Sequence, residues 1–332
     1  MLDLENYKAE EIFNQKHLLC LQDYSKDEIY QVLSLALKLK DMQKLNIPHP
    51  LLKGKTLAMI FTKSSTRTRV SFEVGIHQLG GYGLFLSSGD IQLGRGETIE
   101  DTAKVLSRYV DGIMIRTYEQ SDVVELAKYG TIPIINGLTD SYHPCQILAD
   151  LLTIYEAKRK LSGLKLAYIG DGNNVANSLI IGCSKVGMDI AIGCPQGYRP
   201  NEAAIAMGME NSKISGSSIT ITNSPIAAIR DADAVYTDVW ASMGQEKEKN
   251  IRAEAFSGYQ VNRELFSYAK SDATFLHCLP AYRGKEVTSD IIDGPNSLVF
   301  DEAENRLHVQ KAIMVLLMKE RRGKHGAFYK KS

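Results

Sequence analysis

The regular alternation of short apolar runs with segments of helical spacing constrains the fold of this chain more than any other feature. Over residues 56–135 it predicts strands at 56–61, 83–86, 112–115 and 132–135, with helices at 67–79, 98–109 and 121–128 between them. Parallel strands joined by crossover helices produce this alternation. We therefore expect a parallel sheet covered by helices.

A second series with the same alternation follows a long helix predicted at 144–158. Its strands are expected at 165–170, 189–193, 218–221, 233–237 and 273–276, and its helices at 174–187, 201–211 and 224–230. An amphipathic helix at 26–44 precedes the first series, with Ser25 and Glu28 in capping-box spacing. A final helix at about 303–320 can pack back on the first unit. Two α/β units are the simplest account of a chain of 332 residues.

Composition bounds the partners and the compartment. Lysine plus arginine and aspartate plus glutamate both number 39, so neither nucleic acid nor an anionic membrane is expected as a partner. The five cysteines are scattered and form no CxxC pair, which argues against a disulfide framework and a zinc knuckle. The start of the sequence lacks an apolar signal core, and no later run is suited to span a bilayer. We therefore expect a soluble, cytoplasmic protein.

The stretch SSTRTR, residues 64–69, follows the first predicted strand and opens the next helix. A helix N-terminus at the carboxyl end of a parallel strand offers unpaired N–H groups and a partial positive charge. Ser65, Thr66 and Thr68 can donate hydroxyl hydrogen bonds there. Arg67 adds a two-pronged cationic contact. A phosphate site and an ordinary capped polar turn are both compatible with this segment.

Two further segments place polar side chains near the same sheet edge. Arg116 follows the strand predicted at 112–115, although most exposed arginines are merely solvated. In YHPCQILAD, His143 and Gln146 stand three residues apart at a helix start, with Pro144 suited to the first turn. Both side chains can therefore face one point. A capping histidine and a surface glutamine are the alternative.

The segment IGDGNN, residues 169–174, is similar to a dinucleotide-binding fingerprint, but Val175 stands where the third glycine would be. The pattern therefore disfavours NAD, and no cofactor is expected. Asn173 and Asn174 can offer amides to a ligand or cap the helix that follows.

The segments TDVWASMGQE and LHCLPAYRG each follow an apolar strand of the second series. They supply candidate residues for a crevice between the units: Asp238, Ser242, Met243, His277 and Cys278. A buried structural cysteine is the alternative for Cys278. The cysteines, histidines and acidic residues show no metal-ligand spacing, so no bound metal is expected.

Six motifs, SSTRTR, HPCQILAD, DGNN, DVWASMG, HCLP and FDEAENR, occur in this order along nearly the whole chain. Together they closely resemble the ornithine carbamoyltransferases. The resemblance implies an α/β fold of two doubly wound parallel-sheet domains, with the C-terminal helix packing back on the N-terminal domain. It implies a carbamoyl-phosphate-binding domain at 1–142, joined by helix 305–332, and an ornithine-binding domain at 143–304. It also implies a homotrimer or an assembly of trimers with active sites at subunit boundaries.

The resemblance further implies roles for individual residues. The positions that grip the phosphate of carbamoyl phosphate match Ser65, Thr66, Arg67 and Thr68, and those that complete its pocket match Arg116, His143, Gln146, Cys278, Leu279 and Arg306. Gln92 matches a loop that family members extend into a neighbouring subunit's site. The ornithine-binding positions match Asn174, Asp238, Ser242 and Met243. The catalytic candidates are Arg116, His143 and Cys278, the last matching the family's reactive cysteine.

The implied reaction transfers a carbamoyl group from carbamoyl phosphate to the δ-amine of L-ornithine, giving L-citrulline and phosphate. Putrescine carbamoyltransferases have a similar extension after HCLP, but putrescine lacks the α-amino and α-carboxylate groups that the Ser242-Met243-Gly244 and Asn173-Asn174 segments would hold. An aspartate carbamoyltransferase would lack HCLP. An NAD-dependent oxidoreductase and a non-catalytic, ligand-sensing relative are the remaining alternatives.

Overall fold

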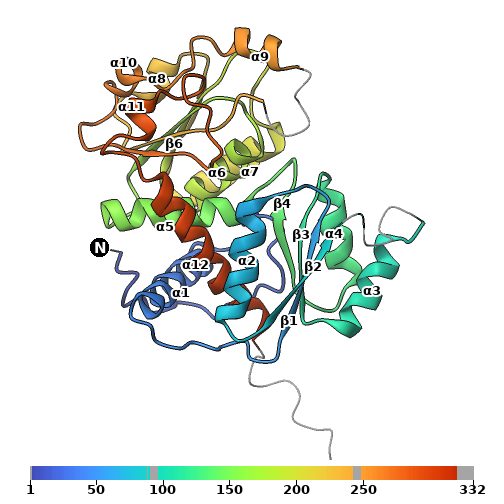
Figure 1. Cartoon of the computed structure of the whole chain (residues 1–332). Helices are drawn as coiled ribbons and strands as arrows, with labels where there is room; N and C mark the ends of the chain where they lie inside the picture. Colours follow the sequence, from blue (N-terminus) through green and yellow to red (C-terminus); the bar gives the residue numbers. More distant parts are fainter. Residues whose placement is uncertain (1, 88, 90–95, 242–247, 320–332) are drawn as a thin grey trace, which may run out of the picture.

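Two parallel α/β units make up the computed structural model, which describes residues 2–87, 89, 96–241 and 248–319. The first unit occupies the lower half of Figure 1, and the second unit lies above it. Within the described ranges, no helix combines the length and the apolar character needed to cross a bilayer.

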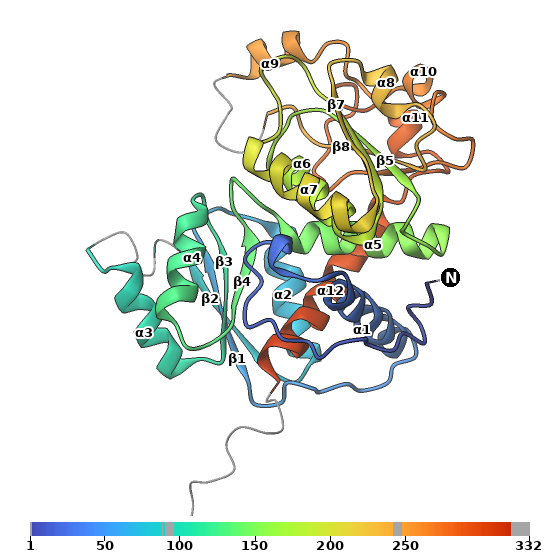
Figure 2. The same ribbon diagram turned by 180° about the vertical axis from the view of Figure 1, so that it is seen from behind.

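The first unit contains a four-stranded parallel sheet in the order β2-β1-β3-β4. Its strands are β1 (Thr56–Phe61), β2 (Tyr82–Ser87), β3 (Gly112–Arg116) and β4 (Ile134–Leu138). Its helices are α1 (Lys26–Lys44), α2 (Thr66–Gln78), α3 (Ile99–Tyr109) and α4 (Gln120–Tyr129). Helices α3 and α4 cover one face of the sheet, and α1 and α2 lie on the other side (Figures 1 and 2). Both faces are therefore buried, as the apolar strand β1 requires.

The second unit contains a five-stranded parallel sheet in the order β7-β6-β5-β8-β9. Its strands are β5 (Lys165–Ile169), β6 (Asp189–Gly193), β7 (Ile219–Thr222), β8 (Ala234–Thr237) and β9 (Thr274–Leu276). Its helices are α6 (Asn174–Val186), α7 (Glu202–Ser215), α8 (Pro225–Ile229), α9 (Lys249–Ala255), α10 (Arg263–Phe266) and α11 (Ser289–Ile292).

Two long helices join the units. Helix α5 (Pro144–Lys158) packs against β4 of the first unit and against α6 and β9 of the second, and it is buried over most of its length. Helix α12 (Val299–Met318) starts beside the second sheet and runs down to pack against α1, α2 and α5 (Figure 1). The predicted fold class, including the return of the last helix to the first unit, is confirmed. The domain boundary at 142/143 stays a prediction.

The strand and helix predictions differ from the structure at four places. The helix predicted at 201–211 continues to Ser215. The strand predicted at 132–135 forms at Ile134–Leu138, after Pro133, whose nitrogen carries no hydrogen for the ladder. The last helix begins at Val299, where the preceding Leu298 provides no side-chain cap that the sequence could have revealed. The short helices η1 (Leu21–Asp23), α9, α10 and α11 were not predicted, because so few turns leave no readable periodicity.

Each sheet contains a point at which the chain reverses its direction of winding. In the first sheet this point lies between β1 and β3, and in the second it lies between β5 and β8. Ligands of open α/β sheets bind beyond the carboxyl ends of strands at such points. In the first sheet, the SSTRTR segment follows β1, and Arg116 is the last residue of β3. In the second sheet, the DGNN segment follows β5, and Asp238 follows β8. The topology therefore brings the predicted site segments together in two groups.

Candidate active site

The turn after β1 places SSTRTR at the N-terminus of α2, as the sequence predicts. Ser65 is the N-cap residue, and its side chain accepts a hydrogen bond from the N–H of Thr68 at 3.2 Å. Thr68 is buried, Arg67 is half-buried and Thr66 is exposed. Because the first turn of an α-helix has N–H groups without intrahelical partners, this turn can hold an anion.

Three arginines approach one another from different elements. Arg116 ends β3, Arg67 lies in the first turn of α2, and Arg306 projects from α12. Burial, together with the positive charges of Arg306 and Arg67, lowers the pKa of Arg116 to about 10. Burial also lowers the pKa of Arg306, and the charge of Arg67 adds to this shift. Guanidinium groups that repel one another in this way favour the binding of an anion between them.

His143 stands where α5 begins. Its backbone N–H donates to Ser178 Oγ at 2.8 Å, and its ring is buried. Burial, with the charges of Arg306 and Arg116, holds the pKa of His143 well below its usual range, so the imidazole is neutral. Within the described part of the chain, His143 Nδ1 has no hydrogen-bond partner. A neutral ring with an unused nitrogen can exchange a hydrogen bond with a ligand.

Direct hydrogen bonds connect several of the predicted carbamoyl-phosphate residues. The side-chain oxygen of Gln146 accepts from Arg306 Nη1 at 2.7 Å, and Arg306 Nη2 donates to Thr68 Oγ1 at 3.2 Å. The Arg67 guanidinium donates to the carbonyl oxygen of Leu279, which belongs to the loop after β9. This last bond connects the two units across the site.

The carboxylate of Asp238 organises the other side of the site. Its Oδ1 accepts from the Cys278 thiol at 3.1 Å and from the N–H of Val239 at 2.8 Å, and its Oδ2 accepts from Asn173 Nδ2 at 2.7 Å. Burial and the negative charge of Asp238 raise the pKa of Cys278 well above its usual range, so the sulfur is a protonated thiol. Asn174 instead donates to the carbonyl oxygen of Thr139 at 2.6 Å.

The buried side chain of Arg252 connects the turn that contains Asp238 with the turn that contains its amide partner, Asn173. Arg252 Nη1 donates to Asp171 Oδ2 at 2.8 Å and to the carbonyl oxygen of Trp240 at 3.0 Å. Arg252 Nε donates to Glu248 Oε2 at 2.9 Å. Asp171 lies two residues before Asn173, and Trp240 lies two residues after Asp238. The ion pair therefore fixes the turn after β5 relative to the turn after β8.

Three potential metal ligands come together at Asp238, His277 and Cys278, whose donor atoms all lie within 4.8 Å of one another. These atoms already take part in hydrogen bonds within the protein. His277 Nδ1 accepts from the N–H of Leu279 at 2.9 Å, and its Nε2 lies 3.3 Å from Glu286 Oε1. A cation would have to replace the bond between Cys278 and Asp238. The absence of a bound metal stays a prediction.

Sequence reasoning missed several polar residues that support the site: Asp150, Asp171, Tyr236, Arg252, Glu286 and Glu302. Asp150 and Glu302 lie within the motifs HPCQILAD and FDEAENR, so their positions were visible, but nothing in the sequence indicated their burial. Three predicted site residues, Gln92, Ser242 and Met243, lie outside the described residues.

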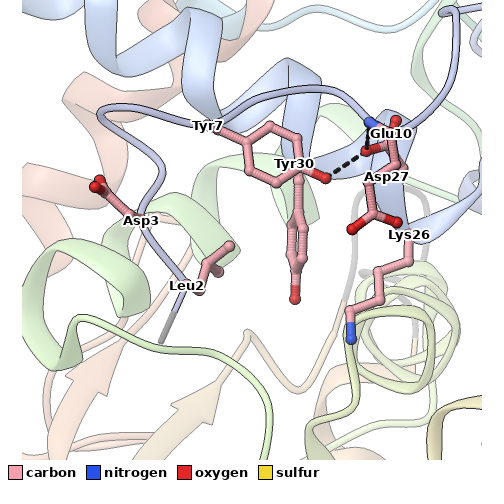
Figure 3. A pocket seen from close by; sticks show the side chains of 7 residues that line it. All are labelled: Leu2, Asp3, Tyr7, Glu10, Lys26, Asp27 and Tyr30. Atoms are coloured by element: carbon pink, nitrogen blue, oxygen red, sulfur yellow. Dashed lines mark hydrogen bonds between the residues drawn. The ribbon is translucent and has the colours of Figure 1, made fainter.

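A separate hollow of about 390 Å³ lies between the N-terminal segment and α1 (Figure 3). The Asp27 carboxylate in this hollow already accepts hydrogen bonds from the Tyr7 hydroxyl and from the backbone N–H of Glu10. None of the predicted site residues lines it. It is therefore distinct from the candidate active site.

Fold and site together define a protein of two parallel α/β units, with an arginine-rich anion cradle at one winding reversal and a carboxylate–thiol–amide cluster at the other. Two family models match such units in this chain. Residues 16–156 match the carbamoyl-P binding domain of aspartate/ornithine carbamoyltransferase, and residues 162–317 match its Asp/Orn binding domain. The chain belongs to the aspartate/ornithine carbamoyltransferase family.

Individual relatives are similar over almost their whole length. The ornithine carbamoyltransferase of Caldicellulosiruptor saccharolyticus is 61% identical over 302 residues, which cover 91% of this chain and 98% of that protein. The ornithine carbamoyltransferase of Bacillus subtilis is 60% identical over 303 residues, or 91% of this chain and 94% of that one. The solved structure of ornithine carbamoyltransferase from Pyrococcus furiosus is 56% identical, with a TM-score of 0.89, covering 91% of this chain and 97% of that chain.

Proposed function

We propose that this protein transfers the carbamoyl group of carbamoyl phosphate to the δ-amine of L-ornithine, forming L-citrulline and phosphate. The main support is that the arginine cluster lies beside the Asp238 cluster. A site suited to an anion is therefore next to a site suited to a cationic amino acid. The identity to relatives named ornithine carbamoyltransferase favours ornithine over putrescine and aspartate.

The arginine-rich side suits the phosphate and the reacting carbonyl. We assign the phosphate to the first turn of α2, with Ser65, Thr66, Arg67 and Thr68 as its contacts and Arg116 beside them. His143 and Arg116 would stabilise the oxygen that becomes negative when the amine attacks the carbonyl carbon. Because its imidazole is neutral, His143 acts there as a hydrogen-bond donor rather than as a second cation.

The Asp238 side suits the amino acid. The Asp238 carboxylate would pair with the α-amino group of ornithine, while Cys278 and the carbonyl oxygen of Leu279 flank the reacting groups. Asn174, Ser242 and Met243 complete the proposed ornithine contacts. Since Cys278 is a protonated thiol beside Asp238, it is poorly suited to remove the proton of the attacking amine. We infer that this proton leaves with the phosphate.

The turn after β5 argues against the dinucleotide alternative. A side chain at Gly172 would collide with the backbone of Arg199 and Pro200, at 2.2 Å from the nearest atoms. The small size of Gly172 therefore allows the chain to pack against itself, rather than opening the turn to a pyrophosphate. This packing, with Val175 in place of the third glycine, gives NAD no support.

We further propose that the protein acts as a homotrimer, or as an assembly of trimers, with Gln92 reaching a neighbouring subunit's site. The support is the sequence resemblance alone. Five free cysteines, four of them buried, suit the reduced cytoplasm that we propose as its compartment. Mixing Gln92→Ala with Asp238→Asn subunits tests the shared site: hybrid trimers should regain activity, whereas no recovery in proven hybrids would contradict it.

The proposed reaction is tested with purified protein, carbamoyl phosphate and three separate acceptors: ornithine, putrescine and aspartate. The carbamoylated product is identified directly by mass. We expect citrulline from ornithine and no comparable product from the other two. Carbamoylputrescine as the main product would overturn the assignment of the acceptor, and phosphate release without any carbamoylated product would overturn carbamoyl transfer itself.

A further inference from the structure

Two buried carboxyl groups face the same amide beneath the candidate active site. Asp150 on α5 is 0% exposed and Glu302 on α12 is 1% exposed. Gln146 Nε2 donates to both of them, at 2.8 Å to Asp150 Oδ1 and at 2.7 Å to Glu302 Oε1. Neither carboxyl group has a role in the proposed reaction so far.

The two carboxyl groups accept different numbers of hydrogen bonds from their surroundings. Glu302 also accepts from the Tyr236 hydroxyl at 3.1 Å and from the N–H of His277 at 2.9 Å. For Asp150, the described residues supply only Gln146 as a donor, and Asp150 Oδ2 is buried without a donor facing it. The two carboxyl side chains also hydrogen-bond to each other, which requires a proton on one of them. An ionised carboxylate oxygen buried without a donor is costly, whereas a protonated one is itself a donor. The geometry therefore fits an ionised Glu302 and a protonated Asp150.

We propose that Asp150 and Glu302 share a single proton, carried on Asp150 Oδ2, and that this pair is a positioning device for Gln146. This inference rests on the proposed carbamoyl transfer, because it deepens the account of the same site. With both carboxyl groups facing its nitrogen, the Gln146 amide has one favourable orientation, and its oxygen points to Arg306. Arg306 in turn holds Thr68 of the phosphate cradle.

The other protonation states fit the contacts less well. If both groups were ionised, two negative charges would share one amide in a buried site. If both were neutral, Glu302 would lose the charge that its three donors stabilise. Burial and the charge of Glu302 raise the pKa of Asp150 well above its usual range. Burial also raises the pKa of Glu302, but there the hydrogen bonds from His277, Asp150 and Tyr236 oppose the shift, in agreement with the geometry. The groups that face the pair from neighbouring elements are Arg306, Tyr236, His277, Cys183 and Cys278.

Two single substitutions separate the roles of the carboxyl groups. Asp150→Asn replaces a neutral acid by a neutral amide that can still accept from Gln146 and donate to Glu302, so kcat/KM for carbamoyl phosphate should stay within about threefold of wild type. Glu302→Gln removes the charged acceptor, and kcat/KM should fall about 10- to 100-fold, mainly through KM. The opposite ranking of the two variants would overturn the proposal.

A matched control lies one turn along α5. Thr153 is buried, donates to the carbonyl oxygen of Ala149 and accepts from Asn305, but it does not contact the pair. Thr153→Val therefore reports the general cost of losing a buried polar group in this helix. If Thr153→Val lowered kcat/KM as much as Glu302→Gln, the pair would have no special positioning role.

The shared proton is observed without any substrate by infrared difference spectroscopy between wild type and Asp150→Asn. At neutral pH, the wild type should show the carbonyl stretch of one protonated carboxyl group that is missing from the variant. No such band would overturn the proposal. A wild type that shows the band but makes no citrulline would instead refute the proposed function, so the two failures can be distinguished.

Discussion

The two sides of the candidate active site are built on opposite principles. On the phosphate side, burial together with the positive charges of neighbouring guanidinium groups lowers the pKa of Arg116 and of Arg306. On the amine side, the carboxylate of Asp238 is already hydrogen-bonded to Cys278 and Asn173. The phosphate side has several positive charges close together. On the amine side, neutral groups of the protein already donate hydrogen bonds to the carboxylate.

Because of this difference, binding of a ligand changes the interactions of each side in a different way. An anion that enters the arginine cluster relieves repulsion that exists in the free protein, so the site is prepared for it. An amino group that enters beside Asp238 must exchange existing hydrogen bonds for new ones. Only a ligand with the right donors can make that exchange favourable, so we expect the proposed amine side to be the selective one.

The largest effect is expected from Arg67→Ala on the phosphate side. The substitution removes a charged contact to the leaving phosphate, and kcat/KM for carbamoyl phosphate should fall by about a thousandfold. Steady-state kinetics with ornithine at saturation measure this effect. Arg69→Ala is the matched control, because Arg69 lies on the same helix but pairs with the exposed Glu73. Equal losses in both variants would contradict the cradle.

A smaller effect, about a hundredfold in kcat, is expected from His143→Ala, which removes a neutral hydrogen-bond donor. Since the pKa of His143 is held well below its usual range, wild-type kcat should show no acidic limb from this imidazole near pH 6.5. The measurement is kcat against pH for wild type and variant. A limb that the substitution abolishes would show that His143 titrates in the working range.

On the amine side, Asp238→Asn should raise KM for ornithine about fiftyfold, because the α-amino group loses a charged partner. KM for carbamoyl phosphate should change by less than about threefold, since the phosphate contacts lie on the other side of the site. Initial rates with each substrate varied in turn give both constants. Equal increases in the two KM values would remove the distinction between the sides.

A smaller effect than that of Asp238→Asn is expected from Arg252→Gln, which leaves Asp171 and Trp240 without their shared donor. KM for ornithine should rise about tenfold and the thermal unfolding midpoint should fall, because a buried ion pair has lost one member. Arg263→Gln is the control, since Arg263 and its partner Asp290 are exposed and such pairs contribute about 0–1 kcal/mol. A loss of stability without any change in KM would limit Arg252 to a structural role.

Acid–base linkage gives a further expectation for the buried pair below the site. A carboxyl group whose pKa is raised on folding binds more protons in the folded than in the unfolded state, so stability falls as pH rises above its unfolded value near 4. Asp150→Asn removes this dependence. Its unfolding midpoint should therefore decline less than that of wild type between about pH 5 and 9. Parallel curves would argue against a protonated Asp150.

The sequence was sufficient for the architecture and for the position of the site motifs at strand ends, whereas the roles of the individual site residues stay predictions. Apolar strands alternate with helices because both faces of a parallel sheet are buried, and turn motifs at strand ends predict where ligands bind. The supporting layer was not predictable. Asp150 and Glu302 look like ordinary polar positions of helices, and only the packing of α5 against α12 makes them a buried pair.

No sequence pattern specifies which partners two neighbouring residues take. The Asn173 amide donates to Asp238 and the Asn174 amide donates to the carbonyl oxygen of Thr139, while the role of Asn174 as an ornithine contact stays a prediction. Both asparagines lie at the start of α6, and their side-chain directions depend on the turn after β5. The position of a polar residue at a helix start is therefore easier to predict than the partner of its side chain.

The most direct test of two differently built sides is calorimetric titration of inorganic phosphate, and of ornithine in the presence of phosphate, into three proteins: wild type, Arg67→Ala and Asp238→Asn. We expect Arg67→Ala to lose phosphate binding, and Asp238→Asn to keep phosphate binding while losing ornithine binding. Loss of phosphate binding in Asp238→Asn, with retention in Arg67→Ala, would contradict the assignment of the two sides.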